Sequence, residues 1–149
     1  MSAKSVFSFL IVVVAVMPSP AENLDPQQAV EAFHTALSSG NRDAALASLS
    51  PEVVIFEGGG AETSREEYAS HHLGGDMKFV QGTSRETVDQ ASSSNGDLAW
   101  VITQSRTTGT YREKSIDVVG TETMVLRRTG DAWQIVHIHW SSRAAKSSH

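Results

Sequence analysis

The sequence predicts one α+β domain, in which three N-terminal helices pack on one face of a curved antiparallel sheet. The first half of the chain carries helix caps and apolar residues at three- and four-residue spacing. The second half consists of alternating or β-branched segments separated by Asn-Gly and Thr-Gly turns. Helices followed by consecutive strands are typical of the α+β class, and a length of 149 residues suits a single domain.

Two helices are expected at residues 26–39 and 42–49. Asp25 can cap the first helix, Pro26 suits its first position, and Gly40 suits the position after its end. The apolar stripe of this helix comprises Val30, Phe33, His34 and Leu37. The second helix is expected to end at a Ser-Pro pair, because a residue before proline disfavours the helical conformation.

A short strand, residues 53–56, separates these helices from a third one. The strand ends at Glu57 and a run of three glycines, which predicts a turn or an open loop. The third helix begins with a Ser-x-x-Glu capping box and is expected to end at the glycine pair 74–75. It carries two adjacent histidines, His71 and His72.

Four long strands are expected after the third helix, at residues 77–91, 98–111, 115–128 and 133–143. The last of them predicts a two-sided element in the middle of the sheet. At period two, one face carries Trp133, Ile135, His137, His139, Ser141 and Arg143. The other face carries Gln134, Val136, Ile138, Trp140 and Ser142. We expect one face to pack on a core and the other to line a pocket or a subunit interface.

The N-terminus has the features of a secretory signal peptide. A positive charge precedes an apolar run, and Ser19 and Ala21 suit the −3 and −1 positions of a cleavage site after Ala21. We therefore expect a signal peptide at residues 1–21, a mature domain at 22–143 and a disordered tail at 144–149. A periplasmic or secreted location follows, with no stable membrane span after cleavage.

Charge and composition exclude several classes of chemistry and partner. The net charge is −5 and there is no basic run, so nucleic acid is not an expected partner. The chain has no cysteine, which excludes disulfides and a thiol nucleophile. The glycine run lacks the lysine and the strand–loop–helix context of a phosphate-binding loop. No cofactor is expected, apart from a metal ion in one alternative given below.

Three stretches of the sequence resemble a single superfamily: residues 41–46, residues 51–54 and the closing segment 130–139. Over residues 26–143 the chain resembles the nuclear transport factor 2-like superfamily, and within it the SnoaL-like and DUF4440-type domains. The closing Trp-x-x-Val-His-x-His-x-Ser pattern is also similar to the end of the association domain of calcium/calmodulin-dependent kinase II.

The resemblance implies a cystatin-like cone, in which a strongly bent antiparallel sheet wraps three helices and leaves a pocket between them. Members commonly form homodimers through the sheet. Their activities range from ketosteroid isomerisation and polyketide cyclisation to dehydration and simple scaffolding. Because one fold carries so many functions, the resemblance leaves open whether this chain is an enzyme.

The first functional hypothesis is that the pocket binds a small organic molecule. The candidate ligand-binding residues are Trp100, Arg106, Tyr111, Glu122, His137, His139 and Arg143. Arginines on strands can bind a carboxylate through two parallel hydrogen bonds, and the aromatic residues supply an apolar wall. The catalytic candidates are His72, His139 and Glu57, because a carboxylate–imidazole pair can transfer protons near neutral pH.

Two alternatives assign the histidines differently. His137 and His139 lie two residues apart in a strand, with Cα atoms about 6.6 Å apart, and with His72 they could hold zinc or copper. Alternatively, they are hydrogen-bonded residues of a non-catalytic dimeric interaction domain, paired with Glu122 or across a dimer interface.

Overall fold

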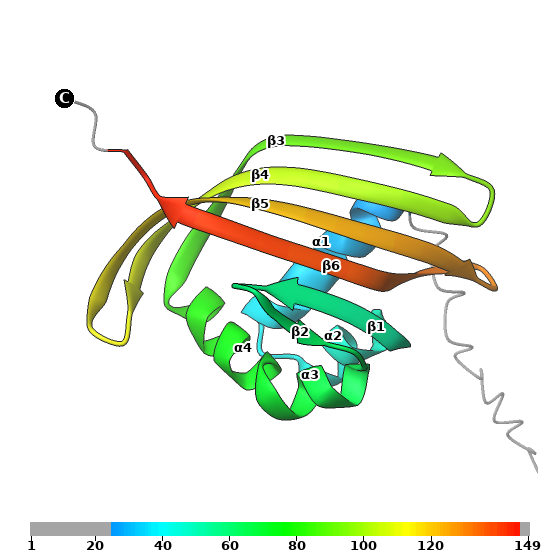
Figure 1. Ribbon diagram of the computed structural model, residues 1–149, viewed down its shortest axis with the longest axis horizontal. Coiled ribbons are helices and arrows are strands. Elements are labelled where there is room, and N and C mark those ends of the chain that lie inside the picture. Colours follow the sequence, from blue (N-terminus) through cyan, green and yellow to red (C-terminus); the bar gives the residue numbers. More distant parts are fainter. Residues whose placement is uncertain (1–24, 147–149) are drawn as a thin grey trace, which may run out of the picture.

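The computed structural model describes residues 25–146 and shows a curved, unclosed six-stranded sheet with helices on one side (Figure 1). The strand order is β2-β1-β6-β5-β4-β3. The strands are β1 (Leu49–Glu57), β2 (Gly60–Glu62), β3 (Thr83–Asn95), β4 (Leu98–Tyr111), β5 (Lys114–Thr129) and β6 (Ala132–Ala144). The predicted α+β cone is thus confirmed. The expected signal peptide lies outside the described residues and stays a prediction.

Four helices form in the described part of the chain, one more than predicted: α1 (Pro26–Ser38), α2 (Arg42–Ala47), α3 (Arg65–His71) and α4 (Leu73–Gln81). The cap predicted for α1 is present, since Asp25 accepts a hydrogen bond from the backbone N–H of Gln28 at 2.8 Å. Gly40 follows the helix with a φ of 72°, a conformation that favours glycine. No helix within residues 25–146 is long and apolar enough to cross a membrane.

The expectation that helix ends at the glycine pair 74–75, and that strand begins at residue 77, is wrong. The segment instead forms α4, and β3 starts only at Thr83. Leu73 and Met77 are four residues apart and both buried, so burial of one helical face outweighs the low helix propensity of the glycines. Asp76 is thereby placed on a helix.

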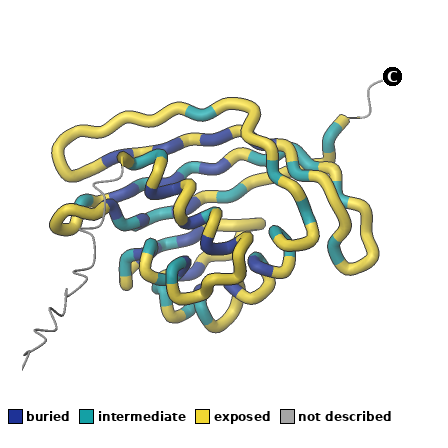
Figure 2. Tube along the Cα trace, turned by 180° about the vertical axis from the view of Figure 1, so that it is seen from behind, coloured by how far each residue is buried: buried dark blue, intermediate teal, exposed yellow. Residues whose placement is uncertain are grey.

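The inner face of the sheet and the helices enclose one hydrophobic core. Along β4, Ala99 and Val101 face the helices and are buried, whereas Trp100 and Ile102 face outward and are exposed. Phe33 and Leu37 bring α1 into the same core. Buried positions accordingly gather where the strands face the helices, and the ends of the long hairpins are exposed (Figure 2).

A β-bulge in β6 overturns the predicted division of that strand into two continuous faces. Val125 pairs with His137 and Leu126 with Ile135, so Val136 is the extra residue. Before the bulge Trp133 and Ile135 are buried; after it Ile138 is buried. His137 and His139 therefore lie on the opposite face of the sheet from Ile135. The strand itself lies between β1 and β5, as predicted for a mid-sheet strand.

Candidate functional site

A cavity of about 560 Å³ lies over the inner face of the sheet, between the strands and helices α1, α3 and α4. The β4–β5 hairpin curves toward α4 (Figure 1), and its residues Tyr111, Arg112 and Ile116 line the cavity. There the rings of Tyr111 and Phe79 pack edge to face, with their centroids 5.4 Å apart, and Arg112 lies over the Tyr111 ring. The cavity is thus enclosed by residues from both halves of the chain.

Two rows of inward-facing residues form the floor of this cavity. Glu57 on β1 pairs with Trp140 on β6, and Trp140 pairs with Glu122 on β5. These three residues therefore form one row that runs across the three strands. The next row, which we call the small-residue row, consists of Ser142, Gly120 and Ser105. Because these three side chains are small, the space above them stays open.

Glu122 is buried and hydrogen-bonded by three donors at one side of the floor. Its carboxylate accepts from Trp140 Nε1 at 2.7 Å and lies 2.9 Å from His34 Nε2. Arg85 Nη2 lies 3.4 Å from the same group. Burial raises the pKa of Glu122, but the bonds from His34 and Trp140 and the charge of Arg85 outweigh burial and hold it below its usual value. Glu122 is therefore an ionised anchor.

A second acidic group lies on the β1 and α4 side of the cavity. Tyr68 is fully buried and donates its hydroxyl hydrogen to Asp76 Oδ2 at 2.7 Å. Burial raises the pKa of Asp76, and the hydrogen bond from Tyr68 opposes this rise only in part. Burial and the nearby charge of Asp76 also raise the pKa of Glu57. Two carboxyl groups with raised pKa values thus line one wall.

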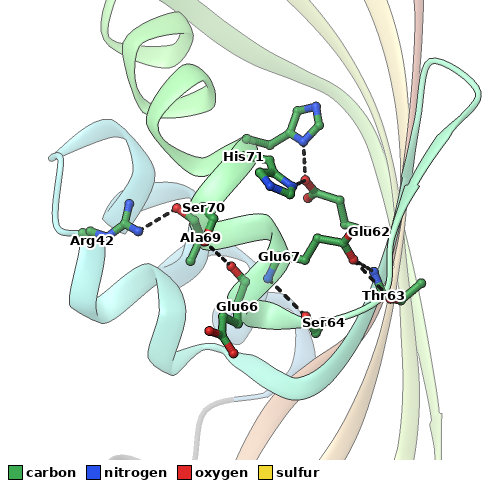
Figure 3. A network of polar contacts seen from close by, with 10 residues as sticks. Arg42, Glu62, Thr63, Ser64, Glu66, Glu67, Ala69, Ser70 and His71 are labelled. Atoms are coloured by element: carbon green, nitrogen blue, oxygen red, sulfur yellow. Dashed lines mark hydrogen bonds and ion pairs between the residues drawn. The ribbon is translucent and has the colours of Figure 1, made fainter.

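His72 and His71 flank this wall through a contact with Glu62. The turn before α3 is fixed by Glu67, which accepts from the Thr63 backbone N–H and donates its own N–H to Ser64 (Figure 3). His71 Nδ1 lies 4.0 Å from Glu62 Oε1, and His72 Nδ1 is hydrogen-bonded to the same oxygen. That hydrogen bond is the main cause that raises the pKa of His72.

The structure divides the predicted site residues between two faces of the sheet. Four of them line the cavity: Glu57, His72, Tyr111 and Glu122. The other five lie on the outer face: Trp100, Arg106, His137, His139 and Arg143. Arg106 is bound there by Asp117 through two hydrogen bonds of 2.9 Å. Neither the predicted ligand-binding residues nor the predicted catalytic residues therefore all lie in one site.

The histidine pair is likewise separated from its predicted metal partner. His137 Nδ1 lies 2.9 Å from the carbonyl oxygen of Val54, and both histidine rings lie against Phe56 on the outer face. His72 lies on the cavity side. Within residues 25–146 no group of three side chains is placed to hold a metal ion. The predicted grouping of His72 with His137 and His139 is therefore wrong.

Sequence reasoning missed three residues of the cavity: His34, Asp76 and Arg85. His34 was assigned to the apolar stripe of the first helix, although a histidine in such a stripe indicates a polar partner across the core. Asp76 lies in the segment whose helix was missed, whereas Arg85 lies within the expected strand 77–91, where no local pattern singled it out. The four-residue spacing of Leu73 and Met77 was the available signal for that helix.

Comparisons with known proteins agree with this architecture. A family model described as a SnoaL-like domain matches residues 27–145. A presumed ketosteroid isomerase from Shewanella frigidimarina is 39% identical, covers 76% of this chain and 92% of its own, and has a TM-score of 0.74. None of the curated proteins compared matches the chain.

Two more distant structures share the fold. A presumed dehydratase of the NTF2-like family from Streptomyces avermitilis is 21% identical over 80% of this chain and 94% of its own, with a TM-score of 0.69. The CaMKII hub of S. rosetta is 20% identical over 86% of this chain and 100% of its own, with a TM-score of 0.67. The resemblance seen in the sequence to the nuclear transport factor 2-like superfamily is confirmed.

Proposed function

The chain belongs to the SnoaL-like domain family, and we propose that its cavity binds a small organic molecule and transforms it by proton transfer. The observation that carries this proposal is the pair of carboxyl groups with raised pKa values, Glu57 and Asp76, on one wall of the cavity. The volume of about 560 Å³ lies within the range of small-molecule sites.

The surroundings of the two carboxyl groups favour different roles. The hydrogen bond that Tyr68 donates stabilises the ionised form of Asp76, and the charge of Asp76 disfavours ionisation of Glu57. In this proposal Asp76 is accordingly the base that takes a proton from carbon, and Glu57, whose raised pKa favours its protonated form, is the acid that donates one to oxygen. A second transfer in the reverse direction restores both groups.

The Shewanella relative supports this class of reaction, since it is a presumed ketosteroid isomerase at 39% identity. Isomerisation of a ketosteroid consists of proton transfers beside a carbonyl group, which a carboxylate base and an acidic donor can perform. The substrate of this chain need not be a steroid, because the residues that line the cavity set its shape.

Deuterium exchange tests the proposal without knowledge of the natural substrate. Ketones of one and two rings, such as 2-tetralone, are incubated with the protein in D₂O, and loss of the proton beside the carbonyl is followed by NMR. We expect exchange faster than in buffer, with a loss of about 100-fold in Asp76→Asn. Asp117→Asn, an exposed aspartate on the outer face, is the matched control. Full activity in Asp76→Asn, or no exchange above buffer, contradicts the proposal.

A second proposal concerns the outer face, which we propose pairs with a second copy of the chain. Two adjacent rows there are apolar or aromatic around the histidines. One runs Phe56, His139, Thr123, Ile102; the other runs Val54, His137, Val125, Trp100. Phe56, Trp100 and Ile102, all members of these two rows, are each more than 40% exposed, as expected of a surface that another protein covers. The hub and association domains among the similar structures also favour assembly.

We also propose export of the chain, on the sequence of residues 1–21. Sequencing of the mature N-terminus tests this, and a start at Glu22 is expected. Retention of residues 1–21 on all of the protein contradicts cleavage.

A further inference from the structure

Arg85 lies beside the cavity floor, on β3. It pairs with Thr107 and Thr107 with Val118, so these three residues form the row next to the small-residue row. The side chain of Arg85 reaches across the small-residue row toward Glu122, where Nη2 lies 3.4 Å from Oε1. The guanidinium therefore lies over the open part of the floor, and its side chain remains 25% exposed.

The guanidinium keeps unused hydrogen-bond donors. It has five N–H groups, and the contact with Glu122 is long for a charge-assisted hydrogen bond. Within residues 25–146 no second acceptor is hydrogen-bonded to the guanidinium of Arg85. Glu122, by contrast, has closer donors in His34 and Trp140. Arg85 consequently has N–H donors that Glu122 does not use and that a ligand could accept from.

The two sides of the cavity differ in chemistry. Arg85 is on β3, but its guanidinium lies beside Glu122 on β5, two strand spacings of about 4.8 Å from Glu57 on β1. Phe79, Ile116 and Val118 supply apolar surface of the same cavity. The cavity thus offers a positive group at one side, apolar walls, and the proton-transfer pair at the other side.

We propose that the molecule bound in this cavity is an amphipathic organic acid whose carboxylate is bound by Arg85. The planar guanidinium matches a carboxylate through two parallel N–H···O bonds, which a neutral amide cannot reproduce. Bound in this way, the apolar body of the acid extends over the small-residue row and its far end reaches Glu57 and Asp76. This inference rests on the proposed function, because it names the substrate class of the same cavity.

Matched pairs of acids and amides test the inference. Binding of 4-phenylbutyrate and 2-naphthylacetate is compared with binding of their primary amides by calorimetry, together with neutral 2-tetralone. Each acid should bind wild type about tenfold more tightly than its amide. The preference should fall below about threefold in Arg85→Gln and be partly retained in Arg85→Lys, which keeps the charge. Arg106→Gln is the matched control, since Arg106 is paired with Asp117 on the outer face.

Thermal melting checks that each variant is folded. If Arg85→Gln does not fold, Arg85→Lys still provides a folded variant in which the acid preference can be measured. Equal binding of acids and amides by wild type overturns the inference, as does an acid preference that survives in Arg85→Gln. If wild type binds neutral 2-tetralone in either of these cases, only the inference about Arg85 fails, and the proposed function is still supported. If no probe of either kind binds wild type, the inference and the proposed function both fail.

Discussion

Glu57 and Glu122 lie in one row of the sheet on either side of Trp140, yet their pKa values are shifted in opposite directions. Glu122 receives hydrogen bonds from three side chains. Glu57 lines the cavity wall, where partial desolvation and the nearby negative charge of Asp76 raise its pKa. Because the pKa of Glu57 is raised and that of Glu122 is lowered, Glu57 is the better candidate for proton exchange and Glu122 is the group that remains charged.

Filling the small-residue row should abolish ligand binding without unfolding the protein. A Cβ at Gly120 would lie 3.5 Å from Ser105 Oγ and from the carbonyl oxygen of Ser141, both ordinary contacts. Gly120→Val should therefore fold and weaken binding of 2-tetralone and the aromatic acids at least about tenfold, or about 1.4 kcal/mol, by calorimetry. Gly74→Ala, a glycine substitution in open space on α4, should bind like wild type. Unchanged binding in Gly120→Val would place the ligand elsewhere.

Asp76 should make the protein less stable as the pH rises. The folded pKa of Asp76 lies above its ordinary value of 3.8, so the unfolded chain ionises first. This group's contribution is fully present below pH 3.8 and is lost as the pH rises through the folded pKa. Asp76→Asn does not lose this contribution. The free energy of unfolding of the variant, measured by urea titration, should therefore rise relative to that of wild type between pH 4 and pH 8.

The control for this titration is Asp117→Asn. The hydrogen bonds from Arg106 lower the pKa of Asp117, so the sign of its pH dependence is reversed. This variant should show no gain on wild type as the pH rises. A gain in Asp117→Asn, or none in Asp76→Asn, would contradict the assignment of Asp76.

Trp140 should stabilise the protein chiefly through its bond to Glu122. Trp140→Phe removes a donor 2.7 Å from a buried carboxylate but keeps a ring beside Phe33. The expected cost is about 1.5–3 kcal/mol at pH 7 by urea unfolding, the usual worth of a hydrogen bond to a charged group.

The cost should shrink in acid. Since the folded pKa of Glu122 is lowered, its contribution is lost as the pH falls through that pKa, and the hydrogen bond from Trp140 then goes to a neutral carboxyl group and is weaker. Measured at a concentration low enough to keep the protein monomeric, Trp100→Phe, on the exposed outer face, should change stability by less than about 0.5 kcal/mol. An equal cost for both tryptophans would remove the special role of Trp140.

A charge in the outer-face rows should weaken self-association. Trp100→Asp places a carboxylate among apolar residues that we propose are covered by a second copy. Sedimentation equilibrium should show a dissociation constant raised more than about tenfold, or about 1.4 kcal/mol. Thr35→Asp, an exposed residue of α1, adds the same charge on the helical side and should leave association unchanged. A wild-type protein that is monomeric at high concentration would end this proposal.

Much of the fold could be predicted because its signals are local. The Asp25 cap, the glycine after α1 and the turns between the long strands each depend on a few adjacent residues. Two non-local effects were missed. Burial of Leu73 and Met77 extends helix through two glycines, and pairing with β5 introduces the bulge at Val136.

These two effects also decided which site residues could be found. The bulge moves His137 and His139 out of line with Ile135, so a strict alternation from Trp133 put them on the wrong face. The extended helix brings Asp76 to Tyr68, a relationship that sequence spacing gave no reason to expect. Glu122 could be named in advance, but its partner His34 is 88 residues away in the chain.

A carboxyl ¹³C NMR titration tests most directly whether Glu57 and Asp76 take up and release protons while Glu122 stays ionised. We predict titration midpoints for Glu57 above 4.5 and for Asp76 above 3.8, together with a midpoint for Glu122 below 4.5. A midpoint of Glu122 at or above that of Glu57 would contradict the account.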